Sequence, residues 1–412
     1  MAASSALAAD RVYTPDADLA WARQRDKAIR ARLEQGDLDS LVNLLLFGTS
    51  FTSQARIKIE NLSEASKSGL VRARVDDLVA GMRKPGGNER LIFLSDLLRR
   101  KGVDIDGPDA GKFVYDQLLR DLQERRTYAV RAAEAKPESA LDRGSLFDDR
   151  GLSLDTSILP DFSLDQTLRD LKKRGVLRED QVSRVAVIGP GLDFIDKNDA
   201  SAYDYYPQQS LQPFALYDSL LRLGLAQPEK LAVSIFDINS RVIDHFQRAR
   251  ERARKNTGYV LQLPRDIARP WSPDLAAYWS ALGNQVGATV PPIKPPAIFK
   301  GLQTRAVRVR PDVVLACEPV DLNIVVERLN LPAAERFDLI VGTNIFVYYD
   351  PSEQTLALEN AGAMLKSGGL LLTNDRLPQA STGTMRQAGM TVVSFDDRDP
   401  AARGAMGWYR KQ

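Results

Sequence analysis

Two patterns of apolar residues divide the chain near residue 160. From Thr14 to about Arg174, apolar side chains recur at the three- and four-residue spacing of amphipathic helices. From Gln181 onward, short β-branched runs that end in Gly, Asp or Asn alternate with helical stretches, which is typical of a parallel sheet covered on both faces. We therefore expect a helical amino-terminal domain and linker over residues 1–160, and an α/β domain over residues 161–412.

Caps and helix breakers predict where the amino-terminal helices begin and end. The first helix is expected to have Thr14 as its N-cap and Pro15 at its first helical position, and to end at Gly36. Further helices are expected over residues 68–82, 88–101 and 108–135. Residues 136–161 are polar and lack a clear period, so they predict the linker, and a helix over 163–174 is expected to lead into the first strand.

Seven apolar runs predict the strands of one sheet. They are residues 184–189, 231–237, 312–318, 337–344, 368–375, 390–397 and 405–411. The connection between the last two has no room for a crossover helix, so these strands are expected to pair antiparallel. The predicted fold class is α/β, a seven-stranded Rossmann-like sheet with a terminal antiparallel hairpin, preceded by a mainly α-helical domain.

Two connections are longer than such a sheet requires. Residues 193–212 hold Tyr203, Tyr205 and Tyr206 and separate the first strand from a helix predicted over residues 213–223. These tyrosines are either a lid over a ligand or solvated residues of a surface loop. Residues 255–301 form a Pro-rich, aromatic insertion between the second and third strands, which we expect to be a partly ordered flap.

Composition narrows the classes of function. The chain has 56 Lys+Arg and 54 Asp+Glu, so no global field favours nucleic acid. With one Cys and one His it cannot assemble a Cys/His zinc site, and a His-dependent hydrolase would need His245, which lies in a helical stretch. No apolar run is long enough to span a bilayer. We therefore expect no metal, no membrane and no nucleic-acid partner, and the oligomeric state stays open.

The strand ends are the positions to examine for chemistry, because ligands bind beyond the carboxyl ends of an open parallel sheet. The first strand leads into a turn of Gly189, Pro190 and Gly191, where a backbone without side chains comes close to a ligand. A dinucleotide fingerprint needs a third Gly where Phe194 stands, which disfavours NAD(P).

Two acids follow at the ends of the next runs. Asp237, followed by Ile238, is expected either to accept hydrogen bonds from both hydroxyls of a ribose or to cap the next helix. Glu318, followed by Pro319, is expected at the end of the third strand, where a carboxylate can receive the amine of adenine, with Asp321 just beyond it. This series indicates an adenosine-containing ligand.

In this order the motifs resemble those of class I S-adenosylmethionine-dependent methyltransferases. The similarity covers about residues 181–412 and extends to the Leu-Lys-Ser-Gly-Gly sequence before the fifth strand, where Ser367 replaces the usual Pro. It implies a methyltransferase sheet with S-adenosylmethionine as cofactor. The implied cofactor-binding residues are Gly189, Pro190, Gly191, Asp237, Ile238, Glu318, Pro319 and Asn344.

A narrower likeness is to the chemotaxis-receptor glutamate methyltransferases. Residues 343–349 resemble their Arg-Asn-Val-x-Ile-Tyr-Phe segment, but the long connection over 193–212 departs from their pattern and puts transfer of their substrate in doubt. Tyr348 from this segment is expected, with Tyr203, Tyr205 and Tyr206, to line a cleft for the acceptor. Asp350 and Glu353 predict a capping box at the next helix start instead of catalytic acids.

The resemblance implies methyl transfer to an unidentified acceptor. With His245 expected far from the methyl group, the acceptor is a small molecule or protein carboxylate or hydroxyl, or a deprotonated nitrogen, unless an acid such as Asp375 is the base. No catalytic residue is assigned. The alternatives are a nicotinamide-dependent oxidoreductase and a non-catalytic protein that retains the fold. A cytoplasmic location is expected; if the Ala-rich start is a truncated signal peptide, the protein is exported.

Overall fold

The structure is a computed structural model that describes residues 10–14, 19–58, 61–134, 157–193, 203–297, 299, 301–377 and 384–412. Several features discussed above lie outside these residues. They are the Ala-rich start, Pro15, most of the predicted linker, and Phe194.

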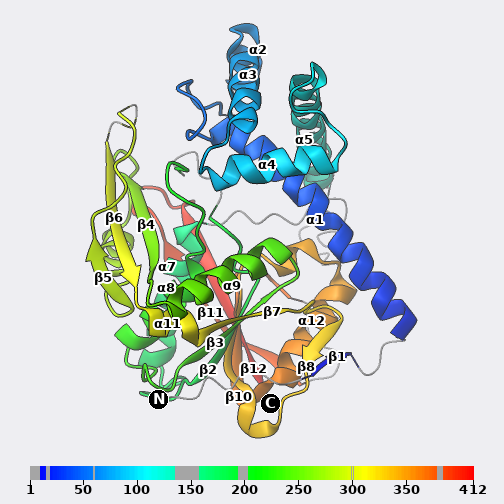
Figure 1. The fold of residues 1–412 in the computed structure, drawn as a ribbon. Coiled ribbons are helices and arrows are strands. Elements are labelled where there is room, and N and C mark those ends of the chain that lie inside the picture. Colours follow the sequence, from blue (N-terminus) through cyan, green and yellow to red (C-terminus); the bar gives the residue numbers. More distant parts are fainter. Residues whose placement is uncertain are drawn as a thin grey trace.

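The amino-terminal helices form a layer with its own hydrophobic core. These helices are α1 (Leu19–Phe47), α2 (Leu62–Lys67), α3 (Leu70–Arg83), α4 (Glu89–Arg100) and α5 (Asp109–Glu134). The ranges of α3, α4 and α5 agree with the predicted helices to within two residues. Helix α4 is capped by Asn88, whose side chain accepts hydrogen bonds from the backbone N–H groups of Arg90 and Leu91. Figure 1 shows this layer above the sheet.

The prediction for the end of the first helix is wrong. Thr14 follows strand β1 (Arg11–Tyr13), which pairs with β8 (Glu327–Leu329); the predicted helix start at Pro15 lies outside the described residues, which resume with α1 at Leu19. Gly36 does not end the helix, which continues to Phe47. A glycine inside a helix costs about 1 kcal/mol, but the segment after Gly36 is almost entirely buried, so packing decides the outcome.

Helix α1 contributes to two separate cores. Its first half places Ala22 and Ile29 in the core beneath the large sheet, whereas Leu38 to Phe47 pack in the core of the helical layer. In Figure 1 the helix runs from that layer down beside the sheet. The two predicted domains are therefore connected by a continuous helix as well as by residues 135–157.

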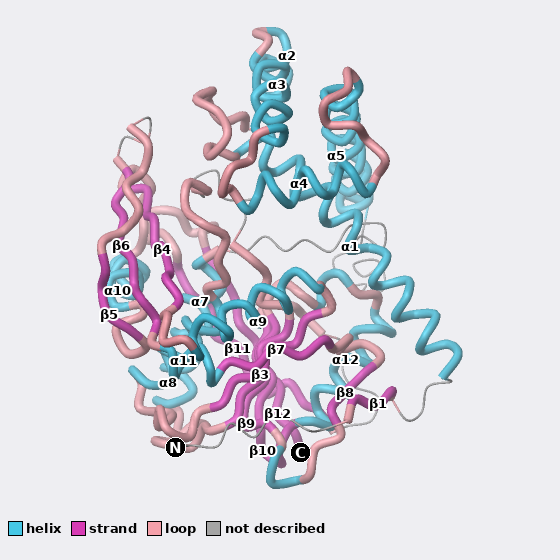
Figure 2. Tube along the Cα trace, viewed as in Figure 1, coloured by secondary structure: helices cyan, strands magenta, loops and turns pink. Residues whose placement is uncertain are grey.

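The large sheet has seven strands in the order β11-β12-β10-β9-β2-β3-β7. Their bounds are β2 (Arg184–Ile188), β3 (Ala232–Asp237), β7 (Cys317–Asp321), β9 (Phe337–Gly342), β10 (Leu365–Thr373), β11 (Met385–Ser394) and β12 (Arg403–Lys411). Strands β2, β3, β7, β9 and β10 are parallel, and β12 is antiparallel to both β10 and β11. The terminal hairpin is thus confirmed, as is the α/β class. Figure 2 shows the strands gathered at the centre of the molecule.

The third predicted strand is misplaced. Residues 312–318 lie mostly in helix α11 (Pro311–Ala316), and the strand itself, β7, starts at Cys317 and runs to Asp321. Proline at the first helical position and Asp312 in the first turn favour the helix. A short apolar run alone does not distinguish a strand from a buried helix turn.

Helices cover both faces of the sheet. The remaining helices are α7 (Ile158–Lys173), α8 (Gln212–Arg222), α9 (Ser240–Arg254), α10 (Pro273–Ala281) and α12 (Pro351–Met364). Alternate residues of β2 point into opposite cores, Val185 and Val187 into one and Ala186 and Ile188 into the other, as the two-residue period of a strand requires.

The start of α12 has the predicted capping box. The Asp350 carboxylate accepts a hydrogen bond from the backbone N–H of Glu353, and the Glu353 carboxylate accepts one from the backbone N–H of Asp350. Both acids therefore satisfy backbone donors of the helix start.

The insertion after α9 is an ordered subdomain, which corrects the expected flap. Strands β4 (Tyr259–Asp266), β5 (Gly287–Val290) and β6 (Leu302–Val309) form an antiparallel sheet in the order β4-β6-β5. Figure 1 shows it beside the main sheet. Trp279 of α10 and Val307 of β6 join the main hydrophobic core, which explains the order. Among the described helices, none has the length and apolar character needed to cross a membrane.

Candidate functional site

Four parallel strands end together where the strand order reverses. Strand β2 lies between β3 and β9, with Ile188 opposite both Phe236 and Gly342, and Asp237 at the end of β3 lies opposite Asp321 at the end of β7. In open α/β sheets, ligands bind in the crevice beyond such a reversal. The carboxyl edge of β2, β3 and β7 is therefore the candidate site.

The turn after β2 has the glycine geometry that was predicted. Gly189 and Gly191 have φ values of 58° and 67°, in the left-handed region that favours glycine. The Gly189 N–H donates a 2.7 Å hydrogen bond to the carbonyl of Phe236, which holds the turn against the end of β3. A Cβ added at Gly189 would overlap the Cδ1 atom of Ile345, so this side chain now fills the space above the glycine.

Asp237 is buried at the carboxyl edge and is not the cap of helix α9. That cap is Asn239, whose side chain accepts a hydrogen bond from the backbone N–H of Arg241. The Asp237 carboxylate accepts a 2.8 Å hydrogen bond from the Asn239 N–H. Burial raises the pKa of Asp237 to about 7, and a carboxylate that ionises near neutrality is ready to accept hydrogen bonds from a ligand's hydroxyls.

The second acid at this edge is Asp321, which corrects the placement of Glu318. Glu318 is the second residue of β7, and it lines a cavity at the opposite end of the sheet with Ser183 and Lys230. Pro319 lies in the middle of the strand. The strand shift described above moves the carboxyl end by three residues, so Asp321 occupies the position that the sequence analysis gave to Glu318.

Helix α1 crosses this edge, and its Arg30 contacts both Ile238 after β3 and Asp321 at the end of β7. The Arg30 guanidinium donates hydrogen bonds of 3.1 Å to the carbonyl of Ile238 and 2.8 Å to the Asp321 carboxylate. Asp26 in turn pairs with Arg30 and accepts a hydrogen bond from Asn323. Sequence reasoning missed these residues, because the only available signal was the apolar face of α1 and nothing indicated what that face covers.

A cavity of about 50 Å³ remains at the carboxyl edge. It is lined by Leu33, Ile188, Gly189, Gly191, Phe236, Asp237, Ile238, Leu322, Ile324, Ile345, Tyr348 and Tyr349. The structure thus brings together the glycine turn, Asp237, Ile238 and Tyr348. A nucleoside-sized ligand needs a pocket of roughly 300 Å³ or more, so Leu33, Ile345 or the α1 backbone must shift for such a ligand to enter.

Asn344 lies at the rim of this edge. Its backbone has a φ of 57°, and its backbone N–H and side-chain oxygen bind the Asn374 side chain at 2.8 and 2.6 Å. Asp375 accepts hydrogen bonds from the backbone N–H groups of Ile345 and Phe346, and burial raises its pKa to about 6. Both residues therefore fix the turn after β9, and Asp375 is already engaged in this structural role.

His245 lies on α9 and bonds the Tyr259 hydroxyl at 2.6 Å. Burial lowers its pKa to about 4. It does not line the cavity at the carboxyl edge, in agreement with its predicted remoteness.

A second cavity, which we call the aromatic cavity, lies beside the first. Its volume is about 70 Å³, and its walls include Asp193, Tyr203, Tyr206, Arg265, Trp271 and Trp279. Gly191 lines the first cavity and Asp193 the second, so a short segment of chain separates them. The predicted acceptor residues are thus divided: Tyr348 belongs to the first cavity, and Tyr203 and Tyr206 to the second.

The tyrosine-bearing connection is fastened to its surroundings. The Tyr206 hydroxyl donates a 2.8 Å hydrogen bond to Asp193, and Tyr203 lies beneath the Arg56 guanidinium at 4.3 Å. Tyr203 and Tyr206 are buried and Tyr205 is half-buried, so the interpretation as solvated surface residues is wrong for the first two.

Asp204 ties the same connection to the helical layer. This buried carboxylate accepts hydrogen bonds from the backbone N–H and hydroxyl groups of both Thr49 and Ser50. Arg90 of α4 adds hydrogen bonds to the carbonyls of Asp193 and Tyr206. The helical layer therefore holds one wall of the aromatic cavity in place.

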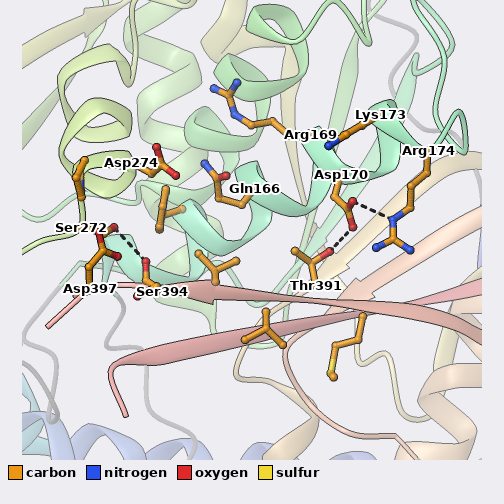
Figure 3. A pocket seen from close by; sticks show the side chains of 15 residues that line it. Gln166, Arg169, Asp170, Lys173, Arg174, Ser272, Asp274, Thr391, Ser394 and Asp397 are labelled. Carbon is orange, nitrogen blue, oxygen red and sulfur yellow. Dashed lines mark hydrogen bonds and ion pairs between the residues drawn. The ribbon is translucent and has the colours of Figure 1, made fainter. Parts of the chain in front are cut away.

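A larger open groove of about 620 Å³ lies elsewhere, between α7 and β11. Figure 3 shows Arg169 and Lys173 of α7 and Arg174 just after it along one side and Thr391 of β11 on the other, with Asp170 bonded to both Arg174 and Thr391. None of the residues predicted for the site lines this groove, and it lies at the outer edge of the sheet.

No protein-family model matches the chain, and no curated protein matches it. Among solved structures, one similar chain is the N-methyltransferase NodS from Bradyrhizobium japonicum in complex with S-adenosyl-L-homocysteine. Its TM-score is 0.30 and its identity 14%, with 66% of this chain and 96% of that chain covered. Another is a TehB-like SAM-dependent methyltransferase from Corynebacterium glutamicum, with a TM-score of 0.27 and 10% identity, covering 61% of this chain and 98% of that one.

A third structure, MtNAS in complex with MTA and tNA, has a TM-score of 0.26 and 10% identity and covers 96% of this chain and 100% of that chain.

Proposed function

We propose that the chain is an S-adenosylmethionine-dependent methyltransferase whose donor site is the carboxyl edge around Asp237. One observation carries the proposal: two acids end adjacent parallel strands in register, Asp237 opposite Asp321, beside a left-handed glycine turn at the point where strand order reverses. An acid that ends the second strand suits a ribose, and an acid that ends the third strand suits the amine of adenine.

The residues present at this edge fit an adenosine-containing ligand. Asp237 has a buried carboxylate that accepts a hydrogen bond from the Asn239 N–H, and a carboxylate has further lone pairs that can accept hydrogen bonds from ribose hydroxyls. Gly189 and Gly191 leave the backbone open to close approach. The Ile238 carbonyl and Asp321, which now bind Arg30, are acceptors for the adenine amine.

The bound cofactor would supply a methyl group already activated on a sulfonium. The protein therefore has to orient the reactants and exclude water more than it has to form covalent bonds. Tyr348 at the donor cavity offers an aromatic ring, which attracts a cation. The acceptor's proton would go to a group other than His245 or Asp375, since the first is remote and the second is engaged with backbone N–H groups.

The division of the chain into residues 1–160 and 161–412 is part of this proposal. The second range would bind the donor, and the first, through α1 and α4, would close the donor edge and support the aromatic cavity. A small-molecule or protein acceptor fits a site enclosed in this way better than nucleic acid does.

Two binding measurements test the proposal. Isothermal calorimetry with S-adenosylhomocysteine should show binding, and NAD⁺ should show none. Asp237→Ala should weaken the binding by about 1.5–3 kcal/mol, the scale of hydrogen bonds to a charged group, whereas Asp312→Ala, an exposed acid at the start of α11, should not. NAD⁺ binding without S-adenosylhomocysteine binding would instead favour the oxidoreductase alternative.

The non-catalytic alternative is tested by turnover. Transfer of a labelled methyl group to any member of a panel of small amines, carboxylates, phenols and peptides would exclude a purely binding role. Tight binding of S-adenosylhomocysteine without transfer to any member of that panel would favour it.

A further inference from the structure

The aromatic cavity contains buried donors that have no protein partner. The indole Nε1 of Trp279 and the Nε of Arg265 are both buried and form no hydrogen bond among the described residues. Trp279 is only 4% exposed, and both residues line the cavity. Because buried N–H groups are nearly always paired, two such donors on one cavity indicate an oxygen atom that a ligand supplies.

Arg265 also brings a positive charge to this cavity, which the acids Asp193 and Asp266 line as well. Its guanidinium lies 4.8 Å from the ring centre of Trp271 and 5.8 Å from that of Trp279, and none of the described carboxylates forms an ion pair with it. The two indole rings hold the guanidinium in position. An anionic oxygen is thus a better match for these donors than a neutral one, and a carboxylate matches the planar guanidinium best.

A different element contributes an acid to the same cavity. The Asp193 carboxylate is oriented by hydrogen bonds of 2.8 Å from the Tyr206 hydroxyl and the Gln209 side chain. Tyr203 and Tyr206 line the same cavity. A carboxylate and aromatic rings in one cavity suit an amine or ammonium group.

We propose that the aromatic cavity is the acceptor site and that it takes a small α-amino acid, or the amino-acid end of a small molecule, with the carboxylate on Arg265 and Trp279 and the amine beside Asp193. This inference rests on the proposed methyl transfer. The volume of about 70 Å³ suits only a small group. Residues 191–193 separate the two cavities, so the amine lies next to the donor edge.

The transfer balances with the groups present. The ammonium first gives one proton to the Asp193 carboxylate. The lone pair of the neutral nitrogen then forms the bond to the methyl carbon while the carbon–sulfur bond breaks, and that electron pair stays on sulfur as a thioether. The products are a methylated ammonium and a neutral thioether, and the proton passes from Asp193 to solvent.

Tryptophan fluorescence tests the site without requiring turnover, because Trp271 and Trp279 line it. The probes are glycine, ethylamine and acetate, titrated with and without S-adenosylhomocysteine. Glycine should change the emission at a concentration at least about tenfold lower than either single-group probe, because each of those leaves one charged partner unpaired. Equal responses to the three probes, or no response to glycine while S-adenosylhomocysteine binds, would overturn the inference.

Substitutions test whether Arg265 and Trp279 are the hydrogen-bond donors that recognise the carboxylate of glycine. Arg265→Gln and Trp279→Phe should each remove most of the preference for glycine over ethylamine, and Trp271 still reports the emission in the second. Arg308→Gln, which removes an exposed cation from the neighbouring strand β6, should keep the preference. Thermal unfolding confirms that each variant is folded. If glycine binds selectively but S-adenosylhomocysteine does not, the cavity assignment stands and the proposed methyl transfer fails.

Discussion

The guanidinium of Arg30 in helix α1 binds Asp321 at the end of strand β7, 291 residues further along the chain, at 2.8 Å. The same guanidinium binds the carbonyl of Ile238 after β3. An adenosine ligand would use both of these groups. Helix α1 of the amino-terminal layer therefore binds groups that the proposed methyl donor would need.

The first prediction concerns the competition between Arg30 and the proposed donor for Asp321 and the Ile238 carbonyl. Arg30→Ala should strengthen S-adenosylhomocysteine binding by a factor on the order of five, since a partly exposed ion pair is worth at most about 1 kcal/mol. Calorimetry measures the change, and Arg99→Ala, which removes an exposed pair with Asp96 on α4, is the control. Weaker binding by Arg30→Ala would mean that Arg30 is a ligand of the donor and not its competitor.

The second prediction is a pH dependence of binding. Burial raises the pKa of Asp237 from 3.8 to about 7, and only the ionised carboxylate accepts hydrogen bonds from both ribose hydroxyls. The affinity for S-adenosylhomocysteine should therefore rise about tenfold between pH 6 and pH 8. Asp237→Asn should abolish this rise, and a rise that persists in the variant would assign it to another group.

The third prediction is the opposite pH dependence for stability. An acid whose pKa is raised on folding stabilises the fold below its unfolded pKa, and that contribution is lost as the pH rises through the folded pKa. For Asp237 the loss falls between pH 3.8 and about 7. Urea unfolding at pH 5 and pH 8 should show the wild type losing more stability than Asp237→Asn. Equal losses would indicate that Asp237 remains ionised throughout.

The fourth prediction separates backbone strain from steric overlap at the glycine turn. Gly189→Ala should cost more stability than Gly86→Ala, because both have positive φ but only Gly189 has a side chain, Ile345, in the way. Strain alone costs about 1–2 kcal/mol. Adding Ile345→Ala to Gly189→Ala should recover the stability that Gly189→Ala loses beyond Gly86→Ala. Urea unfolding measures the two single glycine variants and this double variant. No recovery would place the cost elsewhere in the turn.

The fifth prediction concerns the link between the helical layer and the tyrosine-bearing connection. Asp204→Ala should cost about 2–4 kcal/mol, because it leaves the buried donors of Thr49 and the partly buried donors of Ser50 without this acceptor. Hydrogen exchange should show the loss of protection at residues 48–51 and 203–209 together. Loss at only one of these segments would show that the contact does not couple them.

Local patterns predicted the parts of the fold that local physics decides. Three features depend only on residues close to them in sequence. They are the β-branched run before Gly189, the acid at Asp237 and the capping box at Asp350. The antiparallel pairing of the last two strands follows from a connection too short for a crossover helix. These features place the glycine turn and Asp237 of the candidate site.

The other features depend on contacts between distant segments. Helix α1 continues through Gly36 because the residues that follow are buried against other helices, and the strand bearing Asp321 is displaced because Pro311 starts a helix turn. The insertion is ordered because Trp279 and Val307 reach the main core. Arg30 at the donor edge and Arg265 in the aromatic cavity could not be predicted, since nothing near them in sequence indicates what they meet.

The division of α1 between two cores also has a consequence for synthesis. The residues after Gly36 pack with α3, α4 and α5, which leave the ribosome soon after them. Ala22 and Ile29 belong to the same hydrophobic core as Ile340 and Leu371, which follow more than three hundred residues later. The apolar side of the first turns of this helix therefore stays exposed until almost the whole chain has been synthesised. Chaperone binding to the nascent chain should concentrate on that segment.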